Sequence, residues 1–194
     1  MPAQTDVTIC NLALTMLGAD RITSLLDDTE NARKCNSVYT FVRDEVLRAH
    51  PWNFAIKRAV LAELATPPVF GYDHQFQIPS DCLRVFEVSS GWSDVESETE
   101  FEIEGRALLT DLNTCYIRYI FRQTDPTQFD SSFVNAIAAR LAAEMAYSIT
   151  GHGSMATAMM QIYEQKMSAA RSADAQESGL PDTIGGDVWN QSRI

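Results

Sequence analysis

The sequence predicts an α+β fold that is mainly α: a four-helix bundle with an inserted small antiparallel β lobe and an extended C-terminal tail. Most of residues 1–54 and 130–177 carries apolar side chains at spacings of three and four, the period of a helix that packs on one side. Residues 55–129 instead hold short β-prone runs between turn residues. Residues 178–194 show no periodicity. These ranges define the expected bundle, lobe and tail.

Two helices are expected before the β lobe. Asp6 is placed to cap the first, and Thr29 or Asn31 to cap the second, because short polar side chains accept hydrogen bonds from the free N–H groups at a helix start. Pro51 follows the second helix and should end it near residue 50. An irregular link over residues 22–28 is expected to join the two helices.

Two more helices are expected after the β lobe. Asp130 is the predicted N-cap of the third helix, whose apolar residues recur at steps of four over residues 133–149. The glycines on either side of His152 break this pattern. A separate fourth helix is therefore expected from Ser154 to about Glu177.

The middle of the chain contains five candidate strands. They are Ile56 to Leu61, Leu83 to Val88, Val95 to Ile103, Ala107 to Thr110 and Cys115 to Phe121. Antiparallel pairing is expected because no connection between them is long enough to hold a crossover helix.

Aromatic residues gather in two places. One is the run from Pro51 to Phe54, and the other comprises Phe70, Tyr72 and Phe76. Both are expected to pack in the core where the helical part meets the β lobe, because aromatic side chains bury the most apolar area per residue. A binding pocket is the alternative interpretation.

The composition indicates a globular protein that does not grip nucleic acid. Hydrophobic residues make up 45% of the chain and charged residues 21%. The chain holds 15 Lys and Arg against 26 Asp and Glu, which gives a formal net charge of −11. A broad basic surface for phosphate groups is therefore disfavoured.

The cysteine spacing and the apolar runs indicate in which cellular environment the protein folds. Cys10, Cys35, Cys82 and Cys115 lie far apart without a CxxC pair, so we interpret them as buried thiols. The first residues lack a secretory pattern, and folding in a reducing cytoplasm is expected. The longest apolar stretch, residues 136–149, is interrupted by charges and is shorter than a bilayer requires. We expect no membrane-spanning helix.

Known catalytic and metal-binding patterns are missing from the sequence. It contains no GxSxG, HExxH, calcium-loop or phosphate-loop motif. His50, His74 and His152 lie at a helix end, in an aromatic loop and between glycines, where surface or capping roles are expected. We therefore predict a protein that is not an enzyme and has no cofactor, metal ion or catalytic residue. Paired-carboxylate hydrolysis stays open because acidic residues are abundant.

One acidic pattern is distinctive. The alternating acids are Asp94, Glu96, Glu98, Glu100, Glu102 and Glu104. In an extended strand all six carboxylates would point to one face, where their repulsion is tolerated in water or opposite a basic surface. This face is either solvated or part of a flexible acidic loop, or else it faces a DNA passage or a basic neighbour. An acidic face would keep passing DNA from adhering.

The C-terminal segment carries a Trp that has no local core to join. Val188, Trp189 and Arg193 follow a glycine-rich stretch without periodicity. The Trp either belongs to a frayed end or inserts into a partner, since Trp and Arg are enriched in binding hot spots. On the second interpretation these three residues bind a partner protein.

The order of segments resembles the head-to-tail adaptor proteins of tailed bacteriophages, called tail tubular protein A in short-tailed phages. The resemblance covers nearly the whole chain and begins with the first helix ending at Leu17-Gly18, the link Thr23 to Asp28 with Ala32-Arg33, and Arg43 to Arg48 running into Pro51 to Ala55. It continues with Phe76 to Cys82 and Leu83 to Val85, then Asp111 before the strand Tyr116 to Arg122, and Phe133 to Ala146.

The resemblance implies a structural protein of the virion neck. Similar proteins form a ring, commonly of twelve copies, between the portal protein and the tail nozzle or tail tube. Double-stranded DNA passes through that ring without specific binding. The C-terminal segment of similar proteins reaches along the portal, which implies a portal-binding role for residues 178–194. The protein would be made in the bacterial host cytoplasm.

Two other functions stay open on the sequence. Some similar proteins have been credited with hydrolysis of cell-wall peptidoglycan or other polysaccharides, although no matching motif is present. A cytoplasmic regulatory or packaging factor is the other alternative, and such a factor would be missing from finished particles.

Overall fold

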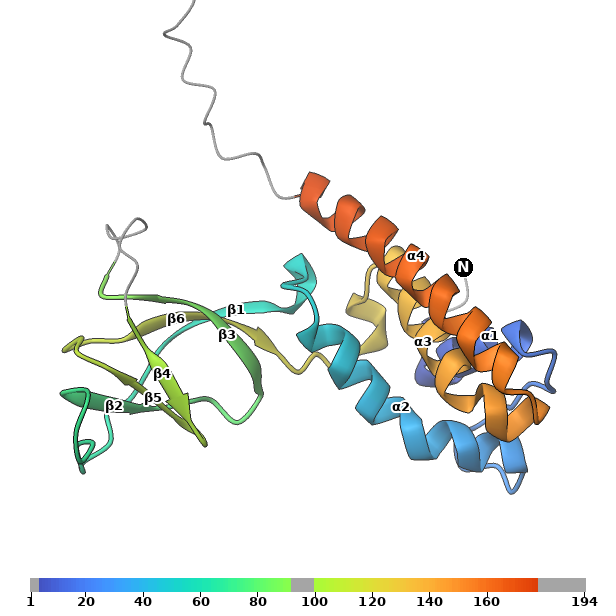
Figure 1. Ribbon diagram of the computed structural model, residues 1–194, viewed down its shortest axis with the longest axis horizontal. Coiled ribbons are helices and arrows are strands. Elements are labelled where there is room, and N and C mark those ends of the chain that lie inside the picture. Colours follow the sequence, from blue (N-terminus) through green and yellow to red (C-terminus); the bar gives the residue numbers. More distant parts are fainter. Residues whose placement is uncertain (1–3, 92–99, 178–194) are drawn as a thin grey trace, which may run out of the picture.

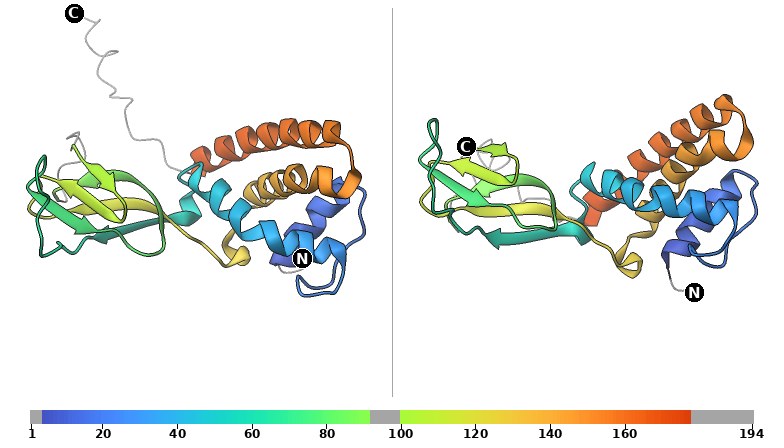
Figure 2. Two further views of the ribbon diagram at one scale, coloured as in Figure 1. Left: turned by 60° about the horizontal axis from the view of Figure 1, so that its bottom comes forward. Right: turned by 90° about the horizontal axis from the view of Figure 1, so that it is seen from below.

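The computed structural model describes residues 4–91 and 100–177 and confirms an α+β fold. The molecule is elongated, with a helical part at one end and a β part at the other (Figure 1). Two further views show the same end-to-end arrangement (Figure 2). The N-terminus lies on the helical part, and the last helix ends near the junction between the two parts.

The first helix, α1 (Asp6–Met16), is capped by Thr5 rather than by the expected Asp6. Thr5 Oγ1 accepts from the Thr8 N–H at 3.1 Å, and Thr8 Oγ1 accepts from the Thr5 N–H at 2.8 Å. This reciprocal pair satisfies two N–H groups of the helix start, which a cap at Asp6 would not do. The Asp6 carboxylate instead accepts a hydrogen bond from Tyr39 Oη at 2.6 Å.

The second helix, α2 (Glu30–Arg48), begins at one of the two predicted caps. Thr29 Oγ1 accepts from the Ala32 N–H at 3.2 Å, whereas Asn31 Nδ2 donates to the Asp20 carbonyl. The link before α2 is ordered by the Asp27 carboxylate, which accepts three hydrogen bonds from Thr23 and Ser24. These bonds, led by the one from the Ser24 N–H, lower the pKa of Asp27.

The third helix, α3 (Ser131–Thr150), starts at the predicted cap. Asp130 Oδ1 accepts from the Ser132 N–H at 2.7 Å. Gly151 then adopts φ 71°, a left-handed conformation that ends the helix and that glycine enters without strain. The fourth helix, α4 (Gly153–Glu177), follows at once. Of the four helices, α3 is the central one, since α1, α2 and α4 each contact it.

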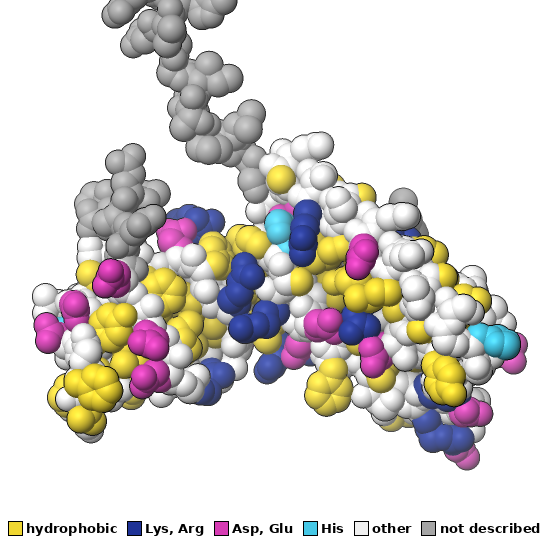
Figure 3. Space-filling view, in the orientation of Figure 1, with side chains coloured by type: hydrophobic (Ala, Val, Ile, Leu, Met, Phe, Trp, Pro, Cys, Tyr) yellow, Lys and Arg dark blue, Asp and Glu magenta, His cyan; other side chains and the backbone are white. Residues whose placement is uncertain are grey.

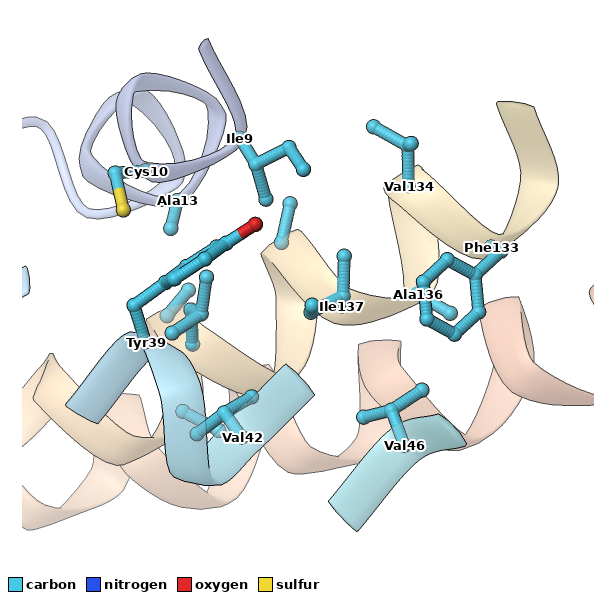
Figure 4. Close-up of a cluster of buried hydrophobic side chains, with 14 of the residues drawn as sticks. Ile9, Cys10, Ala13, Tyr39, Val42, Val46, Phe133, Val134, Ala136 and Ile137 are labelled. Atoms are coloured by element: carbon cyan, nitrogen blue, oxygen red, sulfur yellow. The ribbon is translucent and has the colours of Figure 1, made fainter. Parts of the chain in front are cut away.

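The helical core forms around α3. Figure 4 shows the Tyr39 ring of α2 lying between α1 and α3, with Ile9 and Ile137 beside it. The alanines of α3 let its neighbours approach closely, and six of them are buried. They are Ala136, Ala138, Ala139, Ala142, Ala143 and Ala146. Close packing on several sides follows from this composition.

The β part consists of two small antiparallel sheets. The first sheet has the order β1-β6-β3, and the second has the order β2-β5-β4. The strands are β1 (Ile56–Val60), β2 (His74–Gln77), β3 (Cys82–Ser89), β4 (Glu102–Glu104), β5 (Ala107–Thr110) and β6 (Tyr116–Phe121). Two 3₁₀ turns, η1 (Asn53–Ala55) and η2 (Pro126–Gln128), flank the β part.

The two sheets enclose a second hydrophobic cluster. The cluster consists of Leu61, Phe76, Ile78, Val85, Val88, Leu108, Cys115, Ile117 and Tyr119. Phe76 and Leu108 come from the second sheet, while Ile117 and Tyr119 come from the first. Because residues alternate between the faces of a strand, the neighbours of these residues lie on the outer faces. Arg118 of β6 and Leu109 of β5 therefore point away from this cluster.

The strand predictions need two corrections. The structure has a strand, β2, that the sequence pattern did not indicate. Its buried Phe76 lies between the polar residues Gln75 and Gln77, so the segment has no apolar run. Of the strand expected from Val95 to Ile103, residues 95–99 lie outside the described part, and within it the strand β4 begins only at Glu102. Antiparallel pairing is confirmed for both sheets.

The aromatic and cysteine predictions hold in part. Trp52 is buried and packs with the helical core, as expected. Phe76 is buried too, but in the cluster between the two sheets and not where the helical part meets the β part. Phe70 is 86% exposed, because it lies in the loop between β1 and β2. Three cysteines are buried, and Cys82 is half-buried on β3. Neither described range contains a helix with the length and apolar character of a bilayer span.

We predict that Phe133→Ala lowers the free energy of unfolding by about 4 kcal/mol, because a large buried side chain is replaced by a cavity. Phe133 is fully buried and its ring lies 5.1 Å from the Trp52 ring and 5.0 Å from the Phe129 ring. Urea unfolding followed by circular dichroism measures the change. The matched control is Phe41→Ala, since Phe41 is 76% exposed; equal losses in the two variants would contradict the described core.

Candidate functional site

The described histidines contact carboxylates or lie in a turn. His50 Nε2 lies 3.1 Å from Asp174 Oδ2, and His74 Nδ1 lies 2.7 Å from Glu63 Oε1. His152 is exposed between α3 and α4. Within residues 4–91 and 100–177, no three His, Cys, Asp or Glu side chains are grouped so that they could hold a metal ion.

The helical part and the first sheet meet in a junction built from aromatic rings. Trp52 packs against Phe133, and Phe54 packs against both Phe129 and Phe133 at ring distances of 5.7 and 5.1 Å. Ile120 of β6 joins the same core. The indole N–H of Trp52 donates to the Val46 carbonyl at 3.0 Å, so its polar atom is satisfied as well.

Ion pairs and hydrogen bonds cross the same junction. Arg122 Nε, just after β6, lies 2.7 Å from Asp44 Oδ2 of α2, and the other oxygen of Asp44 binds Arg43. Arg48 of α2 donates to the Leu83 carbonyl of β3. Basic side chains gather in this region, whereas the outer end of the β part carries acidic ones (Figure 3). The junction holds the two parts in one relative orientation.

The last turns of α4 are fixed at this junction. The Asn53 N–H donates to Asp174 Oδ1 at 3.0 Å, and Asn53 Nδ2 donates to the Asp174 carbonyl at 2.8 Å. Asp174 is 9% exposed, so its carboxylate is almost fully withdrawn from water. Residue 178, the first of the predicted tail, therefore follows a helix end anchored beside η1. Val188, Trp189 and Arg193 lie outside the described residues.

The acidic series is only partly described. Asp94, Glu96 and Glu98 lie outside the described residues, while Glu100, Glu102 and Glu104 lie within them. Glu100 precedes β4, and its carbonyl accepts from Thr110 Oγ1 at 3.1 Å. The common face predicted for the series is thus described only for the two glutamates of β4.

Glu102 and Glu104 lie on the outer face of the second sheet. Their register partners on β5 are Leu109 and Ala107. Ile103 between them is paired with Leu108, which is part of the inner cluster. Tyr72 is close to this acidic edge: partial burial raises its pKa, and the negative charges of Glu102 and Glu100 raise it further.

The first sheet has an open groove on its outer face. Arg58 of β1 lies directly opposite Arg118 of β6, and Val60 lies opposite Tyr116. The groove has a volume of about 590 Å³. Its lining residues are Arg58, Ala59, Val60, Glu87, Ser89, Gly91, Tyr116, Ile117 and Arg118. The sequence patterns did not single out this groove, because it depends on which strands pair and in what register.

Arg118 is held in place within the groove. Its Nη1 lies 2.6 Å from Glu87 Oε2 on β3, and its guanidinium carbon lies 5.2 Å from the centre of the Phe86 ring. Arg58 is exposed and has no carboxylate partner among the described residues. The groove therefore combines one neutralised and one free cation with apolar walls.

The sequence was compared with known proteins. No protein-family model matches it, and no curated protein matches it either.

We predict that Asp174→Ala lowers the free energy of unfolding by about 2 kcal/mol, because the Asn53 N–H and His50 lose their acceptor in a buried site. Thermal and urea unfolding followed by circular dichroism measure the loss. Glu177→Ala, which removes an exposed carboxylate from the same helix end, is the control. Equal stability of the two variants would show that Asp174 does not anchor α4.

Proposed function

We propose that the protein is a structural component of a bacteriophage virion, a ring-forming head-to-tail adaptor between the portal and the tail nozzle or tail tube. In this proposal the four helices form the bundle of such adaptors, and residues 178–194 form an extended tail that binds the portal. The ring lines part of the DNA channel. The alternating acidic residues would face either that channel or a basic neighbour.

One structural observation carries this proposal. The end of α4 is anchored beside the junction by Asn53 and His50, so the described helix ends at a fixed place next to the junction. A fixed departure point lets a segment reach a partner in a defined direction. The residues behind the resemblance also coincide with structural elements, since Pro51 to Ala55 forms the junction and Phe133 to Ala146 forms the central helix.

The charge distribution supports an assembly role as well. The chain is strongly acidic overall, with a net charge of −11, yet it concentrates arginines at the junction and in the groove of the first sheet. Opposite charges on separate surfaces favour defined contacts between proteins. An acidic channel surface would repel the phosphates of passing DNA.

We expect the protein to be present in purified virions of the phage that encodes it, in a copy number close to that of the portal protein. Quantitative mass spectrometry of the particles measures this ratio. Absence from finished particles would contradict the adaptor proposal and favour a regulatory or packaging factor. Clearing of peptidoglycan by the purified protein, lost on replacement of a single Asp or Glu, would favour a hydrolase instead.

We predict that removal of residues 178–194 abolishes binding to the portal but leaves the unfolding transition of the body unchanged. Trp189→Ala in the full chain should weaken portal binding by about 30-fold, the effect of losing a hot-spot side chain worth about 2 kcal/mol. Gln191→Ala serves as the control within the same segment. Portal pull-down and light scattering give the readout, and unchanged binding by the truncated chain would contradict this role of the tail.

A further inference from the structure

The two outer faces of the β part carry opposite charge. On the first sheet Arg58 and Arg118 lie opposite each other on the outer face, with Glu87 in register beside them. Lys57 lies on the other face of β1 and pairs with Asp81. The strands of the second sheet contain Glu102 and Glu104 and no Lys or Arg. Because the shared hydrophobic cluster lies between the sheets, these two outer faces point in different directions.

The groove of the first sheet contains two arginines but only one glutamate to pair with them. Arg58 and Arg118 are register partners on adjacent strands, and like charges directly opposite each other destabilise a sheet. Glu87 pairs with Arg118. Arg58 has no matching carboxylate in the part of the chain that the structure describes. A carboxylate from another molecule would complete the alternation of charges across the three strands.

The groove also has an apolar border. Val60 and Tyr116 are register partners at the end far from the helices, and they are 60% and 40% exposed. At the near end, Ile56 and Ile120 are register partners, and Ile120 belongs to the helical core. A fitting partner would therefore combine carboxylates with apolar or aromatic side chains.

The edge of the second sheet has these properties. Glu102 and Glu104 are two residues apart on one face of β4, which places their Cα atoms roughly 7 Å from each other. The arginine pair in the groove lies on adjacent strands, roughly 5 Å apart, and its long side chains can spread to meet both carboxylates. Tyr72, which feels the charges of Glu102 and Glu100, supplies an aromatic side chain beside this acidic edge.

We infer that the Arg58–Arg118 groove of one copy receives the Glu102–Glu104 edge of a second copy of this chain. The two surfaces belong to opposite sides of one β part, so a copy cannot bind its own edge. Each copy uses its groove toward one neighbour and its acidic edge toward the other, which is a head-to-tail contact that closes into a ring or continues as a chain. The inference rests on the proposed ring-forming function and names the surfaces that would form the ring.

Charge reversal on each surface tests the contact. In one variant Arg58→Glu reverses the free cation of the groove, and in the other Glu102→Lys and Glu104→Lys reverse the edge. Each variant alone places like charges across every contact. An equimolar mixture, however, restores opposite charges in both pairings, because the altered groove meets the altered edge and the native groove meets the native edge.

Sedimentation velocity over a concentration series in low salt gives the readout. The native chain should self-associate, and raised salt should weaken the association because the charges are screened. Each variant alone should associate at least about tenfold more weakly, and the mixture should recover to within about threefold of the native chain. Arg21→Glu and Glu164→Lys, which change exposed charges on the helical part, should leave association unchanged.

Several outcomes would overturn the inference: a native chain that stays monomeric at the highest concentration, variants that associate as the native chain does, or a mixture that does not recover although both variants give native circular dichroism. Failure to recover would indicate a different occupant of the groove. None of these outcomes removes the protein from purified virions, so the adaptor proposal is tested separately by the composition of the particles.

Discussion

The outer face of β6 joins the helical part to the β part, and much of the molecule depends on it. Ile120 at one end of this face is fully buried in the helical core, together with Trp52 and Phe133. Two residues earlier Arg118 forms an ion pair with Glu87, and two residues before that Tyr116 is exposed. A single strand face thus passes from core to open groove within five residues. The helices cover only the near half of the first sheet, and the far half forms the open groove.

This arrangement follows from competition between burial and solvation. The near half carries isoleucine at both register positions, Ile56 and Ile120, so covering it with helices removes apolar area from water. The next register pair consists of two arginines, and covering both with an apolar helix face would require desolvation of two like charges. The helical core therefore ends where the charges begin, and the junction is placed by the sequence of β1 and β6.

Local signals in the sequence predict the helices well and the β surfaces poorly. Asp130 and Thr29 are predicted caps that the structure confirms, because a cap needs only residues within one turn. The cap at Asp6 was wrong for a similarly local reason: Thr5 and Thr8 form a reciprocal pair that frees Asp6 to bind Tyr39. The groove, in contrast, brings together β1 and β6, which are about sixty residues apart, and no local pattern fixes their register.

The fixed junction keeps the groove and the acidic edge in a constant direction relative to the helical part. If the β part moved freely against the helices, the direction from groove to acidic edge would vary from copy to copy, and contacts between copies would lead to irregular chains. The aromatic packing around Trp52, the Arg122–Asp44 ion pair and the Asp174 anchor together suppress that motion. A constant angle between successive copies is the condition for a closed ring. The same anchor fixes the end of α4, so in the proposed ring one set of contacts would determine both the angle between copies and the place where the described helix ends.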